Sequence, residues 1–245
     1  MPLGSISFIQ ILFLQPTILY QTCNDQNRNE CENHGWSLPG EVFDCSGNLI
    51  IGNFGGTKIV EKTFDLPPHK FIKFSVTIYK LDSWDMESFE ISVNNELVYT
   101  ISQGNSDGSR NLCKHPSYID NTIYYEKIMT FPNDVFELVI KFQSHLDQDV
   151  DDESWGFRDF RLQIFTPCVN FYTECNYQGE MIQICQGDQT IYQQKIPFEI
   201  RSFRTNSKTI VKIRGSQFSS GNTQQYTSSQ PCLDSFKFPK VEYVQ

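Results

Sequence analysis

The sequence predicts an all-β protein, in which an antiparallel β-sandwich is followed by a smaller β domain. Several short segments alternate apolar and polar residues with a period of two, which is typical of half-buried strands. Turn residues such as Asn94-Asn95 separate these segments. No segment has the 3.6-residue apolar stripe of an amphipathic helix. With 245 residues, 39% of them hydrophobic, the chain is long enough to bury the cores of two domains.

The alternating segments follow one another along the first two thirds of the chain. Strands are expected at 58–64, 72–78, 89–93, 97–99, 123–128, 136–142 and 160–164. Pro67-Pro68 ends the first of them, because proline cannot donate to a strand ladder. Thr166-Pro167-Cys168 closes the series, so we predict a β-sandwich over residues 22–167 and a smaller β domain over 168–245. Within the smaller domain, strands are expected at 181–185 and 209–213.

Eight cysteines form an even set without a CxxC pair or zinc-type spacing. This pattern favours disulfides and therefore an oxidising, extracellular or granule-lumen location. The apolar run Ile6 to Leu14 predicts a signal peptide over residues 1–21, although it lacks a preceding Lys or Arg; a buried strand is the alternative. No segment approaches the ~18 consecutive apolar residues of a membrane span.

The charge balance narrows the range of partners. The net charge is −9, from 20 Lys and Arg against 29 Asp and Glu. Nucleic acids and anionic membranes need a basic surface, which this composition does not favour. An excess of carboxylates is compatible with divalent cations. We therefore expect proteins or glycans as partners, with no nucleic acid.

Two segments combine clustered carboxylates, a serine and a tryptophan, and each leads into an alternating strand. The first is 81–93 and the second is 146–156. Carboxylates repel one another unless a cation lies among them, and all-oxygen clusters suit Ca²⁺. The predicted calcium ligands are Asp82, Asp85, Glu87, Asp149, Asp151, Asp152 and Glu153. The alternatives are a solvated acidic loop, or a carboxylate pair that hydrolyses a glycosidic bond.

Trp84 and Trp155 lie within these acidic segments. An aromatic ring offers apolar contacts to the CH groups of a sugar, so the two residues are candidate ligand-binding positions. The alternative is that both are structural anchors of the core. The segments Asp82-Ser83-Trp84-Asp85-Met86-Glu87 and Asp152-Glu153-Ser154-Trp155-Gly156 resemble an extracellular β-sandwich module of secreted and surface proteins of protists and some bacteria. That module is similar to jelly-roll carbohydrate-binding domains, and the resemblance covers roughly residues 36–167.

The second domain resembles the βγ-crystallin Greek key. Tyr172, Tyr177, Gly179 and Ser202 lie on its signature positions, where aromatic residues pack at a hairpin corner and glycine takes a conformation closed to side chains. In this domain we expect the disulfides Cys175–Cys185, around the corner, and Cys168–Cys232, which bracket the domain. Cys23, Cys31, Cys45 and Cys113 are then left for the first domain, with three connectivities open.

Together, the two resemblances imply a secreted, non-enzymatic structural or binding protein that responds to calcium, in a secretory granule or an extracellular coat. A lectin-like glycan-binding module is the alternative, and a secreted glycoside hydrolase is a third. The sequence has no phosphate-binding glycine loop, nucleophile elbow or zinc-type His/Glu spacing, which favours a non-enzymatic function.

Overall fold

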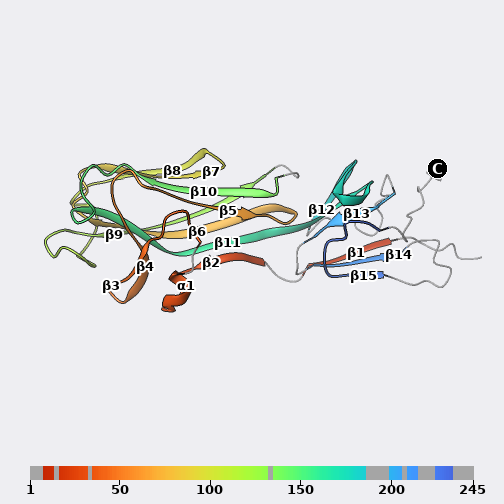
Figure 1. Ribbon diagram of the computed structural model, residues 1–245, viewed down its shortest axis with the longest axis horizontal. Helices are drawn as coiled ribbons and strands as arrows, with labels where there is room; N and C mark the ends of the chain where they lie inside the picture. Colours follow the sequence, from red (N-terminus) through yellow and green to blue (C-terminus); the bar gives the residue numbers. More distant parts are fainter. Residues whose placement is uncertain are drawn as a thin grey trace, which may run out of the picture.

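The computed structural model of this chain is nearly all β, and its strands pair antiparallel (Figure 1). It describes residues 8–13, 17–32, 35–131, 135–185, 199–205, 209–214 and 224–233. The larger sheet has the order β3-β4-β11-β6-β9, formed by Glu41–Cys45, Asn48–Phe54, Glu153–Tyr172, His69–Asp82 and Asn121–Thr130. The second sheet has the order β5-β10-β7-β8, formed by Ile59–Asp65, Glu137–Ser144, Glu87–Val93 and Glu96–Gln103. The predicted antiparallel β-sandwich is confirmed.

Alternating residues of the two sheets form the main hydrophobic core. In β10, Leu138, Ile140 and Phe142 are fully buried, and the residues between them are partly exposed. Burying one such side chain stabilises the fold by about 1.5–3 kcal/mol. The hairpin between β7 and β8 turns at Asn94 and Asn95, whose φ angles of 49° and 66° are those of a tight two-residue turn.

The N-terminal segment forms strands. β1 (Phe8–Phe13) pairs with β14 (Thr209–Arg214), and β2 (Thr17–Thr22) pairs with β11. The short helix α1 (Arg28–Glu32) follows. The structure therefore has strands within residues 1–21, and cleavage of this segment as a signal peptide stays a prediction. Among the described residues, no helix combines the length and apolar character needed to cross a membrane.

A second, smaller hydrophobic cluster lies around the end of β11. Strands β12 (Met181–Cys185) and β13 (Ser202–Arg204) pair with this end, and β1, β14 and β15 (Gln224–Tyr226) form a separate three-stranded sheet. Val169, Phe171 and Phe203 are fully buried here, and Ile11 of β1, 7% exposed, belongs to the same cluster. β11 runs without a break through residue 167 into this region (Figure 1). Residues 186–198, 206–208, 215–223 and 234–245 lie outside the described residues, so the Greek-key domain stays a prediction.

The predicted hairpin corner has the local geometry expected from its sequence. The rings of Tyr172 and Tyr177 pack edge to face, with centroids 6.0 Å apart. The 3₁₀ turn η1 (Cys175–Tyr177) leads to Gly179, whose φ is +81°. A Cβ atom at Gly179 would overlap the Thr173 hydroxyl, which explains why glycine is required there.

All eight cysteines form disulfides, as predicted, but the pairing expected for the second domain is wrong. The pairs are Cys23–Cys31, Cys45–Cys113, Cys168–Cys185 and Cys175–Cys232. Cys168 and Cys185 lie directly opposite each other where β11 pairs with β12, a register that the sequence alone does not reveal. Cys175 lies in the turn beyond β11, where the backbone N–H of Asn176 donates to the carbonyl of Pro231, next to Cys232.

Candidate cation site and groove

The two acidic segments lie side by side, although about 60 residues separate them in the sequence. Asp82 at the end of β6 is directly opposite Glu153 at the start of β11. The backbone N–H and the hydroxyl of Ser83 donate to the carbonyl of Asp152, at 3.0 and 2.8 Å. The pairing of β6 with β11 therefore brings both segments to one end of the larger sheet.

Both tryptophans of these segments belong to the core. Trp84 and Trp155 have no exposed surface. The Trp84 indole N–H donates to the Ser154 carbonyl, and that of Trp155 donates to the Ser144 hydroxyl, both at 2.9 Å. A ring without exposed surface cannot stack on a sugar, so the predicted ligand-binding role of these residues is corrected to that of structural anchors.

Asp82 is neutralised from within the protein. Its carboxylate is fully buried, accepts the His115 backbone N–H at 3.0 Å and lies 3.5 Å from the Lys114 ammonium. Burial raises the pKa of Asp82, and Lys114 together with the His115 N–H opposes that shift. Asp82 therefore already has a cationic partner, and it lies outside the group of carboxylates spaced to share an ion, so this arrangement does not favour Asp82 as a calcium ligand.

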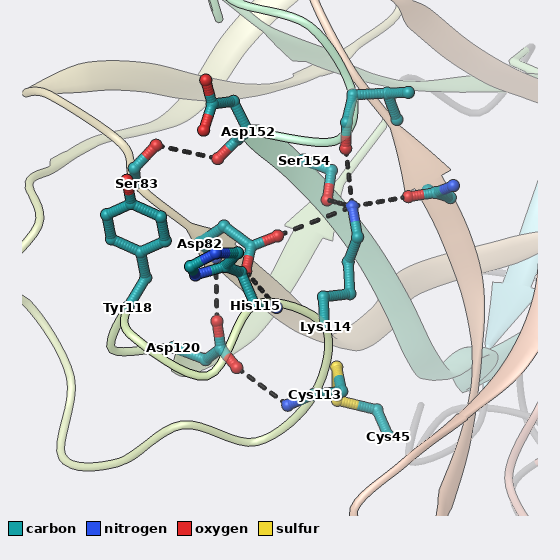
Figure 2. Close-up of polar contacts among 12 residues, drawn as sticks. Cys45, Asp82, Ser83, Cys113, Lys114, His115, Tyr118, Asp120, Asp152 and Ser154 are labelled. Carbon is teal, nitrogen blue, oxygen red and sulfur yellow. Dashed lines mark hydrogen bonds and ion pairs between the residues drawn. A yellow bond between two sulfur atoms is a disulfide. The ribbon is translucent and has the colours of Figure 1, made fainter.

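The ammonium group of Lys114 contacts four parts of the fold (Figure 2). Besides Asp82 of β6, its ammonium donates to the Asn53 side-chain oxygen of β4 at 2.9 Å and to the Ser154 hydroxyl of β11 at 2.9 Å. It also donates to the Val150 carbonyl at 2.6 Å. Val150 belongs to the loop 145–152 between β10 and β11, so Lys114 anchors this loop to the larger sheet.

Three other carboxylates converge at the same end of the sandwich. Glu87 begins β7, Asp147 lies in the loop 145–152, and Glu153 begins β11. One carboxylate oxygen from each lies within 4.8 Å of the other two. Oxygen ligands about 2.4 Å from a Ca²⁺ ion are at most about 5 Å apart, so this spacing is compatible with a shared ion.

No ion pair among the described residues balances the charge of this cluster, although the Lys80 ammonium lies close enough to interact electrostatically with Glu153. Glu153 is fully buried, and its carboxylate accepts the backbone and side-chain N–H groups of Gln148, at 3.3 and 3.2 Å, together with the backbone N–H of Asp147. Desolvation raises the pKa of Glu153, and the charge of Glu87 adds to the shift. Among the described residues, no lysine or arginine forms an ion pair with these three carboxylates. The set therefore has the oxygen chemistry, and the charge without an ion-pair partner, that favour a divalent cation.

The structure thus brings together two of the seven predicted ligands, Glu87 and Glu153. Asp85, Asp149, Asp151 and Asp152 are exposed and lie outside the group. Asp152 contributes its backbone carbonyl to Ser83, and in Figure 2 its carboxylate points away from that contact. Asp147 was missed by the sequence prediction. Its position in the second acidic segment was the available signal, but only the loop geometry distinguishes it from its neighbours.

A groove of about 590 Å³ lies next to the cluster and shares its loop. Gln148, which donates to Glu153, also lines the groove together with Asp149 and Val150. The other residues that line the groove are 38–39, 53–56 and 58. A Cβ atom at Gly55 would come within 2.9 Å of the Val150 Cα, so glycine allows the chain at residue 55 to lie against the loop 145–152 beside the groove.

No known protein-family model matches the sequence, and no curated protein matches it. Among solved structures, the chain is similar to the CBM36-1 domain of a multidomain xylanase from the hindgut metagenome of Trinervitermes trinervoides. The sequence identity is 13% and the TM-score is 0.31, and the match covers 61% of this chain and 96% of that domain. It is also similar to a family 35 carbohydrate binding module from Clostridium thermocellum, with 12% identity, a TM-score of 0.31, and coverage of 61% and 98%.

A third similar structure is the GH115 4-O-methyl-alpha-glucuronidase BtGH115A, with 11% identity and a TM-score of 0.31. This chain spans only 16% of that enzyme's length. Likenesses of this size do not indicate what the present chain binds.

Proposed function

We propose that this chain is a secreted, non-enzymatic binding module in which a Ca²⁺ ion held by Glu87, Asp147 and Glu153 orders the loop 145–152. The observation that carries the proposal is the continuity of that loop. Asp147 belongs to the carboxylate cluster, and the next three residues line the groove. An ion bound at Asp147 fixes the position of the adjoining wall. The four disulfides are consistent with an oxidising compartment.

A glycan is the ligand that best fits the groove. Leu38, Pro39 and Val150 offer apolar surface, which suits the CH face of a sugar ring. Lys58 and Asp149 supply hydrogen-bonding groups around it, whereas the Asn53 side-chain oxygen and the Gln148 side-chain N–H are already bonded to Lys114 and Glu153. This combination supports the lectin-like alternative derived from the sequence.

The lining of the groove also supports a non-enzymatic function. Hydrolysis of a glycosidic bond requires two carboxyl groups that face one cleft. Asp149 is the one carboxylate among the residues that line this groove. Glu87, Asp147 and Glu153 are not among the residues that line the groove, so they do not supply a second carboxyl group to it.

Calcium binding is tested by thermal unfolding of the full chain in calcium and in chelator. The full chain is used because β2 is part of the larger sheet. We expect calcium at a hundred times its dissociation constant to stabilise the protein by about 2.7 kcal/mol, a shift of a few degrees. Asp147→Asn should abolish that response, and in chelator it should slightly raise the melting temperature by removing a repulsive charge.

Asp151→Asn is the matched control, because it removes the same charge from the same loop at an exposed position outside the cluster. It should keep the calcium response. Equal melting temperatures of the unmodified chain in calcium and in chelator would contradict the proposed site.

Glycan binding is tested on a glycan array in calcium and in chelator. We expect binding in calcium, and a reduction of at least tenfold on removal of the ion, because the loop wall loses its anchor. The double variant Lys58→Ala, Asp149→Ala removes two exposed polar groups of the groove and should lose binding while it keeps the calcium response. Glycan binding that survives in the double variant would exclude the groove as the glycan-binding site.

The glycan array also distinguishes glycan binding from calcium-dependent assembly, the function that the sequence resemblances imply. If calcium stabilises the chain but no glycan binds, calcium-dependent association with other copies or other secreted proteins becomes the leading function. Light scattering with and without calcium measures that association directly.

A further inference from the structure

A second pocket, of about 420 Å³, lies on the face of the larger sheet that points away from the sandwich core. Tyr79 of β6 and Thr122 of β9, which line this pocket, lie directly opposite each other, whereas the neighbouring Ile78 points into the main core. The Cys45–Cys113 disulfide and the chain around Arg110 border the pocket. None of its lining residues lines the groove beside the carboxylate cluster.

The side-chain oxygens of Asp120 and Asn121 in this pocket are already occupied. Asp120 is 1% exposed, and its carboxylate accepts the backbone N–H groups of Asp82, Leu112 and Cys113 at 2.7 to 2.9 Å. The side-chain oxygen of Asn121 accepts the backbone N–H of Thr122 at 2.9 Å. These oxygens are therefore not free to accept a hydrogen bond from a ligand.

The donors, in contrast, are largely free. The side-chain oxygen of Asn48 accepts a hydrogen bond from Arg158, so the Asn48 amide turns its NH₂ group away from that contact. Among the described residues, the side chains of Ser109, Arg110 and Thr122 have no hydrogen-bond or ion-pair partner. The pocket is thus rich in donors and carries one unpaired guanidinium.

We propose that this pocket binds the oxyanion group of a small ligand, with Arg110 as the residue that holds the charge. A guanidinium matches the two oxygens of a carboxylate, sulfate or phosphate with two parallel hydrogen bonds. Asn48 and Thr122 are placed to donate to the remaining oxygens or to hydroxyl groups of the same ligand. A cationic ligand is disfavoured, because the one carboxylate in the lining is buried and already accepts three backbone hydrogen bonds.

The site is tested by titration calorimetry of the full chain with D-glucuronate, glucose 6-sulfate, glucose 6-phosphate and glucose. The three anions share one sugar and differ in the oxyanion, so they identify which group is preferred. We expect at least one anion to bind, with an affinity at least tenfold above that for glucose. That affinity should fall with added salt and should not change when calcium is chelated, because the carboxylate cluster is a separate site.

Arg110→Gln should weaken binding of the preferred anion at least tenfold. Arg110→Lys, which keeps the charge, should retain part of the affinity for that anion. Lys127→Gln is the control, since it removes the same charge from an exposed position on β9 outside the pocket, and it should have no effect. Melting temperatures verify that each variant is folded. The proposal is overturned if no anion binds, if glucose binds as well as the anions, or if Arg110→Gln leaves the affinity unchanged. Loss of anion binding in the Lys58→Ala, Asp149→Ala variant would assign the ligand to the groove instead.

Discussion

Replacing Lys114 with methionine should lower the free energy of unfolding at pH 7 by about 3 kcal/mol. The substitution keeps most of the side-chain volume but leaves the Asp82 carboxylate buried without its counter-charge, which typically costs about 3–5 kcal/mol. We expect the lower end of this range because the Lys114 side chain is 19% exposed, whereas that of Asp82 is fully buried. Urea denaturation of the full chain measures the loss.

The pH dependence of that loss tests its cause. Burial raises the pKa of Asp82, and removal of Lys114 raises it further. A carboxyl group whose pKa is higher in the folded state than in the unfolded state destabilises the protein above that folded pKa, and the penalty disappears as the pH falls through it. The difference between Lys114→Met and the unmodified chain should therefore shrink as the pH is lowered from 7 towards 5.

Two further variants separate the charge effect from the loss of packing. Adding Asp82→Asn to Lys114→Met removes the unpaired charge and should recover part of the stability. Lys127→Met replaces an exposed lysine and should change the stability by less than about 0.5 kcal/mol. A pH-independent loss, or no recovery in the double variant, would mean that the ion pair is not what stabilises this region.

Replacing Trp155 with alanine should lower the free energy of unfolding by about 3–5 kcal/mol, as truncation of a large buried aromatic residue does. Trp155 lies in the centre of the aromatic core, with ring centroids 4.8 Å from both Phe54 and Phe89. Its loss leaves a cavity and removes the N–H that donates to the Ser144 hydroxyl, which in turn donates to the Gly56 carbonyl at the groove. Thermal and urea unfolding measure the effect.

Control variants distinguish a structural residue of the core from a residue that contacts a ligand. Tyr124→Ala removes an aromatic side chain that is 62% exposed and should change the stability little. Trp155→Phe should lower the free energy of unfolding less than Trp155→Ala does, because the phenylalanine ring keeps most of the packing. If Trp155→Ala abolished glycan binding at unchanged stability, the assignment of this residue to the core would be wrong.

The sequence by itself determined the fold class, because the side chains of a strand point alternately to opposite faces. The run Phe136, Leu138, Ile140 and Phe142 could therefore be assigned to a strand with one buried face. The structure places the last three residues of this run, all fully buried, in β10, and Phe136 immediately before it. The presence of disulfides was also predictable from composition. Their pairing was not, because it depends on register: Cys168 and Cys185 are partners since they lie opposite each other on β11 and β12.

The sequence also indicated that the two acidic segments belong together, but it did not indicate which of their carboxylates act together. Asp82 and Glu87 are five residues apart in one segment, yet Asp82 points to Lys114 and Glu87 points to Asp147 and Glu153. That separation is decided by the tertiary structure. Lys114 is brought to Asp82 from a loop 32 residues away in sequence, and a buried carboxylate that has acquired a lysine no longer favours a metal ion.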